Sequence, residues 1–443
     1  MVALALAAAL ASLVQVRNAE ADRLAAATLD RQTWVGQGAR NPHSAAHFAT
    51  WAFRPQTPLS VLDPGVTPYA GSAIWMEAHA RNPAAARPVA DSAAGSFAGG
   101  FSTAFLLQMV VPLLLFGVGA GMVARERERG TLRLALASGA EAPAMVRAKA
   151  GALMRIAALI ALPVAGAGLL AALLAGPADP VRLLLWLLAH ALFLMAIAAI
   201  AVAVSALSQR SLSALTLLAA LWLVMLLAVP RIEAALADRL APAPSTEAFW
   251  GAVKADMELL PDVFGNGADA FGAEMAKRYG VGTVEELPVN FAGLQLDAAE
   301  RAEADVHNRH YARLHAIYER QREVLRWLGL LSPLVPLQAV SQAIAGTRLS
   351  AQLAFERQAE AHRFDMVAAL NRDMIERAGK ADYDYKADAA LWASLPDFAY
   401  RPPSLGEALR PALPDLALLI GWLLLGAGLI AFSGRRLARA LVG

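Results

Sequence analysis

Three histidines in the first fifth of the chain have the types and spacing that come closest to a metal site. His43 and His47 are four positions apart, so on a helix both imidazoles would share one face. His79 could supply a third ligand, and neutral imidazole suits zinc and copper. The alternative is that these side chains cap and pack a loop. Because the three positions are scattered along the chain, we assign no metal ligand from the sequence.

Other catalytic constellations are missing from the sequence. A phosphate-binding loop needs a glycine-rich turn followed by Lys and Ser or Thr, and none occurs. There is no H-E-x-x-H or G-x-S-x-G motif, and no acidic pair inside an apolar segment, to act as nucleophile and base. The absence of cysteine excludes disulfides and thiolate metal sites. We therefore expect no enzyme, no catalytic residue and no cofactor bound by this chain.

The remaining histidines have simpler interpretations. His307, His310 and His315 fall on one amphipathic helix, where we expect a solvated, charged face. His190 lies inside an apolar segment, where an ionisable group is a candidate for function. Because no acidic partner occurs in the interior of the apolar segments, a neutral imidazole hydrogen-bonded to a neighbouring helix is favoured over a proton relay.

The elements that must position these residues are mostly membrane helices. The 443 residues are 57% hydrophobic and only 17% charged, whereas roughly a quarter of the residues in a soluble domain are charged. The apolar residues form discrete blocks, which predicts an all-α polytopic membrane protein. The formal net charge is +2 and no basic patch alternates with aromatics, so nucleic acid is not expected as a partner.

Five segments qualify as membrane spans of about 20 apolar residues, and a sixth at the start of the chain is apolar over fewer residues. We interpret this short segment as a span whose start extends upstream of Met1. The six predicted spans are residues 1–16, 103–124, 151–175, 183–207, 212–230 and 415–432.

Basic residues are concentrated in the link 125–150, at Arg210 in a short turn, and in the tail 433–443. With six spans these segments fall on one side of the membrane, which the positive-inside rule identifies as the cytoplasm. The long segments 17–102 and 231–414 then face outward, and both termini are cytoplasmic.

The larger outward segment is predicted to contain two long helices, at 297–328 and 350–378. Between them, residues 329–347 carry no charge. A seventh span there would move the basic tail outside, so we expect a helix lying on or dipping into the outer leaflet. The two long helices would form a hairpin standing on the membrane.

The link 125–150 alternates arginine with glutamate and then turns hydrophobic again. Thr131 is expected to N-cap a short helix, and Pro143 suits the first turn of the next one. Taken alone, this composition favours a solvated turn whose positive charge fixes the orientation of the chain.

This link also carries a resemblance to a known family. The sequence "GMVARERERGTLRLALASG…RAKAGAL" resembles the E-x-E-x-G-T-L…K segment of ABC-2-type transporter permeases. "NPHSAAHFATWAFRPQTPLSVLDPGVTPYAG", "WMEAH" and "LSPLVPLQAVSQAIAGTRLSAQLAFERQAEAHR" look like the DUF3526 branch of that superfamily, which is related to permeases associated with multicopper-enzyme maturation. The resemblance extends over nearly the whole chain. Two features depart from the family pattern: no interfacial helix precedes the first span, and "LASGAEAP" is more polar than the usual continuation.

The resemblance implies that the link 125–150 is a coupling elbow, whose part at 125–137 contacts a separate ATPase subunit. The matching positions are Glu126, Glu128, Gly130, Thr131, Leu132 and, at the entry to the next span, Lys149.

The implied function is that of a permease subunit of an ABC-2-type exporter in the bacterial cytoplasmic (inner) membrane. Its implied partners are an ABC ATPase subunit, which binds ATP and Mg²⁺, and a second permease in a homodimer or heterodimer. Membrane lipid is a further contact, because the elbow arginines would lie at anionic headgroups. One alternative is a mechanotransmission subunit that moves the outer domain without translocating a substrate. Another is a membrane enzyme, which the missing catalytic constellation disfavours. The cargo is not identified.

Overall fold

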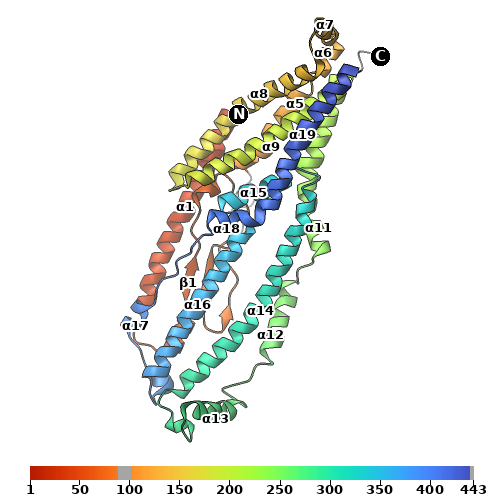
Figure 1. Ribbon diagram of the computed structural model, residues 1–443. Coiled ribbons are helices and arrows are strands. Elements are labelled where there is room, and N and C mark those ends of the chain that lie inside the picture. The colour runs from red at the N-terminus through yellow and green to blue at the C-terminus, as the bar shows by residue number, and fades with distance from the viewer. Residues whose placement is uncertain (88–100, 440–443) are drawn as a thin grey trace.

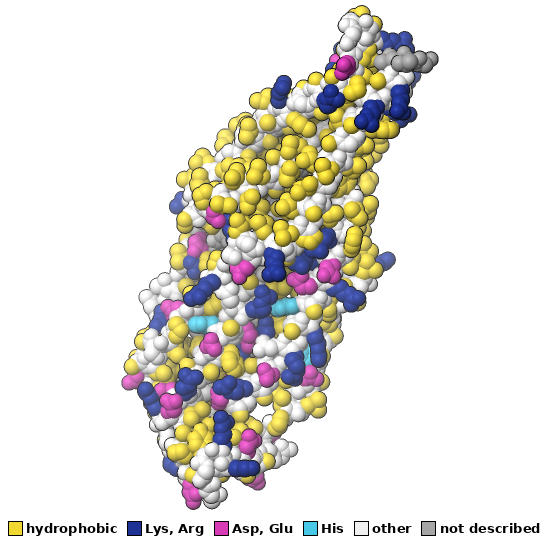
Figure 2. Space-filling model, in the orientation of Figure 1, with side chains coloured by type: hydrophobic (Ala, Val, Ile, Leu, Met, Phe, Trp, Pro, Cys, Tyr) yellow, Lys and Arg dark blue, Asp and Glu magenta, His cyan; other side chains and the backbone are white. Residues whose placement is uncertain are grey.

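The computed structural model describes residues 1–87 and 101–439. The predicted segments 17–102 and 433–443 therefore extend partly over residues outside the described ones. The fold is helical and elongated, as the sequence predicts for its class, and hydrophobic and charged side chains separate along its length (Figures 1 and 2). We call the two parts the apolar half and the polar half.

The apolar half contains the helices that are long and apolar enough to cross a membrane, so the chain is a membrane protein. Six such helices occur in the described residues, in agreement with the predicted number of spans. Their bounds are Val2–Val35, Thr103–Glu128, Ala142–Ala175, Pro180–Leu207, Ser211–Ile232 and Leu405–Arg439.

In the labels of Figure 1, α1 (Val2–Val35) begins in the apolar half and continues into the polar half. The second long helix comprises α4 (Thr103–Phe105), a π-helical turn (Leu106–Val110), α5 (Val111–Gly119) and α6 (Ala124–Glu128). The other membrane-length helices are α8 (Ala142–Ala175), α9 (Pro180–Leu207), α10 (Ser211–Leu221) with a second π-helical turn (Trp222–Ala228) and the start of α11 (Val229–Leu240), and α18 (Leu405–Leu409) leading into α19 (Leu413–Arg439).

Small residues bring the helices of the apolar half close together. α9 is central and packs against α5, α8, α10 and α19. A Cβ added at Gly119 of α5 would lie 2.6 Å from the Cβ of Ala201 in α9, and one added at Gly426 of α19 would lie 2.9 Å from that of Ala199. Such contacts let helix backbones approach closely without bulky side chains.

The uncharged stretch 329–347 contains α15 (Leu334–Ala345). Its twelve residues rise about 18 Å, less than the roughly 30 Å of a hydrocarbon core, so α15 does not form a seventh span. Most of its side chains are buried, and it packs against α9 and α19. Its position relative to a membrane surface stays a prediction.

The polar half is built on the predicted pair of long helices. α14 (Phe291–Leu328) and α16 (Leu349–Arg377) pack against each other and are joined by α15. Trp34 at the end of α1 is buried in one core cluster with Phe355 and Trp392, and its indole donates to the Trp392 carbonyl at 3.1 Å. The shorter helices are α2 (Pro42–Phe48), α12 (Thr246–Met257), α13 (Ala268–Tyr279) and α17 (Ala389–Ser394).

A small antiparallel sheet lies in the first outward segment of this chain, for which the sequence predicted an all-α fold. Its order is β1 (Thr50–Phe53), β2 (Ala73–Glu77), β3 (Ala80–Arg81). Strands of four, five and two residues are too short for an alternating pattern to stand out in the sequence. In Figure 1 the sheet lies between α1 and α16.

Candidate functional site

The predicted coupling elbow forms two short helices at the far end of the apolar half (Figure 1). α6 ends at Glu128, and α7 (Thr131–Ala137) begins after Gly130, which adopts a left-handed φ of 78°. We predicted that Thr131 would cap α7, and that is wrong: Gly130 holds the N-cap position, and the Thr131 hydroxyl donates to the Glu126 carbonyl at 3.2 Å. Because glycine tolerates this backbone conformation, it allows the sharp turn between α6 and α7.

Both glutamates of the elbow make contacts within the chain. Glu126 forms an ion pair with Lys149 of α8. Glu128 accepts hydrogen bonds from the backbone N–H and the hydroxyl of Ser211, at 2.9 and 2.7 Å, and so caps the start of α10. The structure therefore brings together two of the predicted site residues, Glu126 and Lys149, and gives Glu128 a structural partner that the sequence did not indicate.

The base of the elbow is also fixed to the end of α9. Arg127 donates to the Ala206 carbonyl at 2.7 Å and to the Ser208 carbonyl. The buried Ser205 hydroxyl donates to the Ala120 carbonyl and accepts from the N–H groups of Val123 and Ala124. These bonds satisfy backbone groups left over at the helix ends and tie α6 to the turn between α9 and α10.

Among the described residues, none of these bonds reaches the outward face of α7. Leu132 is buried, whereas Thr131 and Arg133 are exposed and the Leu134 side chain is 69% exposed. Leu134, beside the exposed Arg133 at the tip of the molecule, is accessible to another protein.

The three histidines considered as metal ligands in the sequence, His43, His47 and His79, lie together in the polar half. His43 and His47 share one face of α2, and His79 occupies the two-residue turn between β2 and β3. Their ring centroids are 4.7, 5.4 and 5.5 Å apart, and one ring nitrogen of each lies within 4.8 Å of the others. Burial, together with the neighbouring imidazoles, lowers the pKa of His43 to about 4, so this ring is neutral at pH 7.

His79 is held in an unusual backbone conformation by two acidic residues of α14. Its φ is 61°, in the left-handed region that non-glycine residues seldom adopt. Its backbone N–H donates to Glu300 at 2.9 Å, and its Nδ1 lies 2.6 Å from Glu303, an interaction that raises the pKa of His79. The fully buried Arg363 of α16 holds Glu300 in turn, at 2.5 Å.

The prediction of a solvated histidine face on α14 is wrong for two of its three members. His307 and His310 are buried, because α12 and the sheet cover that side of the helix. His310 pairs with Asp256 of α12 at 2.9 Å. His315 is half-buried and lines a cavity.

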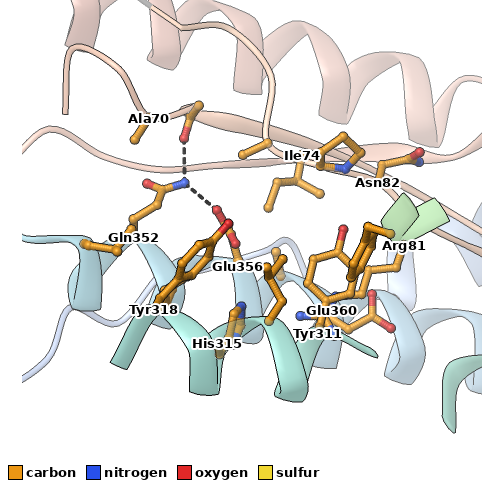
Figure 3. Close-up of a pocket in the computed structure, with 18 of the residues that line it drawn as sticks. Ala70, Ile74, Arg81, Asn82, Tyr311, His315, Tyr318, Gln352, Glu356 and Glu360 are labelled. Carbon is orange, nitrogen blue, oxygen red and sulfur yellow. Dashed lines mark hydrogen bonds between the residues drawn. The ribbon is translucent and has the colours of Figure 1, made fainter. Parts of the chain in front are cut away.

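That cavity has a volume of about 610 Å³ and lies between the sheet and the helices α12, α14 and α16. In Figure 3, Ile74 and Arg81 come from the sheet side, and Tyr318 and Gln352 from the helices opposite. The Gln352 amide donates to the Gly71 carbonyl and to Glu356, both at 3.0 Å. Burial raises the pKa of Glu356, although the arginines near it act in the opposite direction and lower it. The lining thus combines aromatic rings with charged groups of both signs, which suits a polar or amphipathic ligand.

The helices that hold these residues belong to a segment with known relatives. Residues 265–401 match the DUF3526 family, described as a domain of unknown function. The matched segment contains α14, α15 and α16, and therefore Glu300, Glu303 and Arg363. No curated protein and no solved structure matches the chain.

A buried polar chain runs from the apolar half to the DUF3526 segment. His190 of α9 contacts Gln108 of the second long helix at 3.2 Å and the Trp186 carbonyl at 2.9 Å. The Trp186 indole donates to Ser341 of α15 at 2.8 Å, and Ser341 donates to the buried Asp63 at 2.5 Å. The prediction that His190 bonds to a neighbouring helix is confirmed.

Sequence analysis missed the residues that support the predicted ones. Glu300 and Glu303 were inside a predicted helix, three positions apart and so on one face, which was an available signal. Nothing in the sequence linked them to His79 or to Arg363, because those contacts join segments more than sixty residues apart.

Proposed function

We propose that this chain is the membrane-spanning permease subunit of an ABC-2-type exporter, driven by a separate ATPase that docks on the elbow at 125–137. The observation that carries the proposal is the geometry of α7. It projects beyond the bundle with Leu134 exposed, while the preceding helix α6 is bonded to α8, α10 and the end of α9. A docking element needs both features: a free outer face and a firm inner attachment.

The attachment provides a route for movement. α7 leads directly into α8, Glu128 holds the start of α10, and Arg127 holds the end of α9. A rigid-body push on α7 would thus act on α8, α9 and α10, of which α9 packs against α5 and α19 through small residues. Rearrangement of packed helices as rigid bodies is a common way to convert a local contact into a global change.

The proposal includes the partners and orientation that the sequence implies. The elbow and both termini would be cytoplasmic, in a bacterial inner membrane, with the polar half outside. The ATPase would bind ATP and Mg²⁺, and a second permease, identical or related, would complete the pathway. Elbow arginines such as Arg125 and Arg129, both exposed, would contact anionic lipid headgroups.

Substitution of Leu134 by aspartate tests the docking. Placing a charge on the exposed face of α7 is expected to reduce co-purification of the ATPase at least tenfold and to lower hydrolysis by the complex. Leu259→Asp, at an 82% exposed position in the polar half, is the matched control and should change neither. Equal co-purification of the ATPase with the Leu134→Asp and wild-type chains would exclude docking on α7. Reversal of Glu126 and Glu128 is a poorer test, because both carboxylates also bond within the chain.

One observation favours the second candidate, a mechanotransmission subunit. α1 is unbroken over 34 residues and carries Trp34 into the core of the polar half, so movement in the apolar half would pass directly outward. The two functions differ in proteoliposomes. An exporter should show ATPase activity stimulated by a cargo that accumulates on the far side. A mechanotransmitter should hydrolyse ATP and change the position of its polar half with no cargo.

A further inference from the structure

We propose that His43, His47 and His79 form a binding site for one divalent transition-metal ion, of the class of zinc(II) or copper(II). The site lies in the polar half, away from the elbow, and does not depend on the proposed export function. Three imidazoles from two separate elements converge, with one nitrogen of each within 4.8 Å of the others. A tetrahedral zinc ion holds its ligand nitrogens at about 2.0–2.1 Å, and so about 3.4 Å from one another.

Closing the site onto an ion requires the ligand nitrogens, which lie within 4.8 Å of one another, to approach by up to about 1.4 Å through side-chain movement. His47 is exposed, so its ring can turn without displacing packed atoms. His43, by contrast, is fixed through its helix: the Asn41 side chain caps α2 by accepting from the His43 N–H at 2.9 Å, and α2 packs on α16. One adaptable ligand and one fixed ligand on the same face suit capture of an ion from solvent.

His79 has the support typical of a metal-ligating histidine. Its Nδ1 faces Glu303 at 2.6 Å, so an Nδ1–H donor leaves Nε2 with a free lone pair. A carboxylate behind the ring fixes the tautomer and raises the basicity of the ligand nitrogen. A second acidic residue, Glu300, holds the backbone N–H at 2.9 Å and stabilises the left-handed turn that directs the ring toward α2.

The alternative ligand set, His79 with Glu300 and Glu303, is less suited to an ion. Glu300 is paired with Arg363 at 2.5 Å, and both side chains are only 2% exposed, so its charge is already compensated. Glu303 is occupied by Nδ1 of His79. These carboxylates therefore act as positioning residues, and the imidazoles are the ligands. A set of three imidazoles favours borderline transition ions over Mg²⁺ and Ca²⁺, which prefer oxygen ligands. A water molecule would fill the fourth position.

Titration of the full-length protein in detergent with zinc chloride tests the proposal. After removal of metals with a chelator, isothermal titration calorimetry should show one Zn²⁺ bound per chain, and Mg²⁺ should not compete. Loss of a residue that only positions a ligand weakens metal binding ~10–100-fold, and Glu303→Gln should fall within that range. His43→Gln and His47→Gln each remove a ligand and should weaken zinc binding more than that. His362→Gln, at a half-buried histidine of α16 outside the cluster, should bind as the wild type does.

Copper provides a second readout that needs no variant to fold. The electron paramagnetic resonance spectrum of the wild-type protein with one equivalent of Cu²⁺ should show coupling to three imidazole nitrogens. Substoichiometric zinc binding, equal weakening by His362→Gln and His43→Gln, or a copper spectrum with oxygen ligands only would each overturn the proposal.

Discussion

The two halves of the molecule are held together by different interactions. In the apolar half, small residues such as Gly119, Ala201 and Gly426 let helices touch along their backbones. In the polar half, a buried charge pair joins two long helices: Arg363 of α16 bonds to Glu300 of α14 at 2.5 Å, and within α16 it also bonds to Glu360 at 2.8 Å.

This difference indicates which half can move. Contacts between small apolar residues in a bilayer are van der Waals contacts with no fixed hydrogen-bonded partner, so one packing of the helices can be exchanged for another without leaving a polar group unpaired. A buried ion pair loses much more if one partner leaves, because the remaining charge is uncompensated. We therefore interpret the apolar half as the part that rearranges and the polar half as a rigid body that it carries.

The largest effect is expected from Arg363→Met. Removing this buried guanidinium leaves Glu300 and Glu360 without their common partner, which should cost about 3–5 kcal/mol. Hydrogen exchange should show loss of protection in α14 and α16, with the apolar half little changed. Arg357→Met, at an exposed position of the same helix, is the control and should be nearly neutral. Equal protection in the Arg363→Met and Arg357→Met chains would contradict the rigid character of the polar half.

Asp63 offers a smaller effect with a defined pH dependence, because it connects the two halves. Burial raises its pKa from 3.8 to about 6. Below pH 3.8 the carboxyl is protonated in both the folded and the unfolded chain. Between pH 4 and 6 the folded state binds more protons than the unfolded state, so stability falls as the pH rises.

Above pH 6 the ionised Asp63 should therefore cost about 2–3 kcal/mol, since one pKa unit corresponds to ~1.4 kcal/mol. Asp63→Asn removes this ionisation, and thermal melts should show the variant gaining stability over the wild type from pH 4 to pH 6. A difference in melting temperature that stays constant over this range would show that Asp63 does not titrate as described.

A still smaller effect is expected from Gly119→Leu in the apolar half. The new Cβ would meet Ala201 at 2.6 Å, and separating α5 from α9 should cost about 1–3 kcal/mol. Gly117→Leu, two positions away where nothing lies within 4 Å, is the matched control. The measurement is the thermal melt in detergent, together with ATPase coupling. We expect Gly119→Leu to lose more ATPase coupling than its loss of stability explains. Similar coupling in the Gly119→Leu and Gly117→Leu variants would mean that the α5–α9 contact does not rearrange.

Much of the fold was predictable from the sequence, because membrane helices and long amphipathic helices carry strong local signals. The spans and the pair α14 and α16 were predicted from apolar length and periodicity. The three-stranded sheet was not, since its pairing Trp51↔Trp75 joins short segments across a long loop.

The candidate sites were predictable in part. The sequence indicated the histidines and the elbow residues, but not their partners. The donation from Ser211 to Glu128, and the position of Glu303 behind His79, depend on contacts between distant segments that no spacing rule reveals. The same holds for His307 and His310, whose burial is decided by α12 packing over them.

The central claim, that an ATPase docks on α7, is tested most directly by site-specific photocrosslinking. A photoreactive amino acid is placed at Leu134, at Leu424 on the exposed surface of the apolar half, or at Leu259 in the polar half. The account predicts a crosslink to the ATPase subunit from position 134 and none from 424 or 259. A crosslink from position 259 with none from 134 would contradict it.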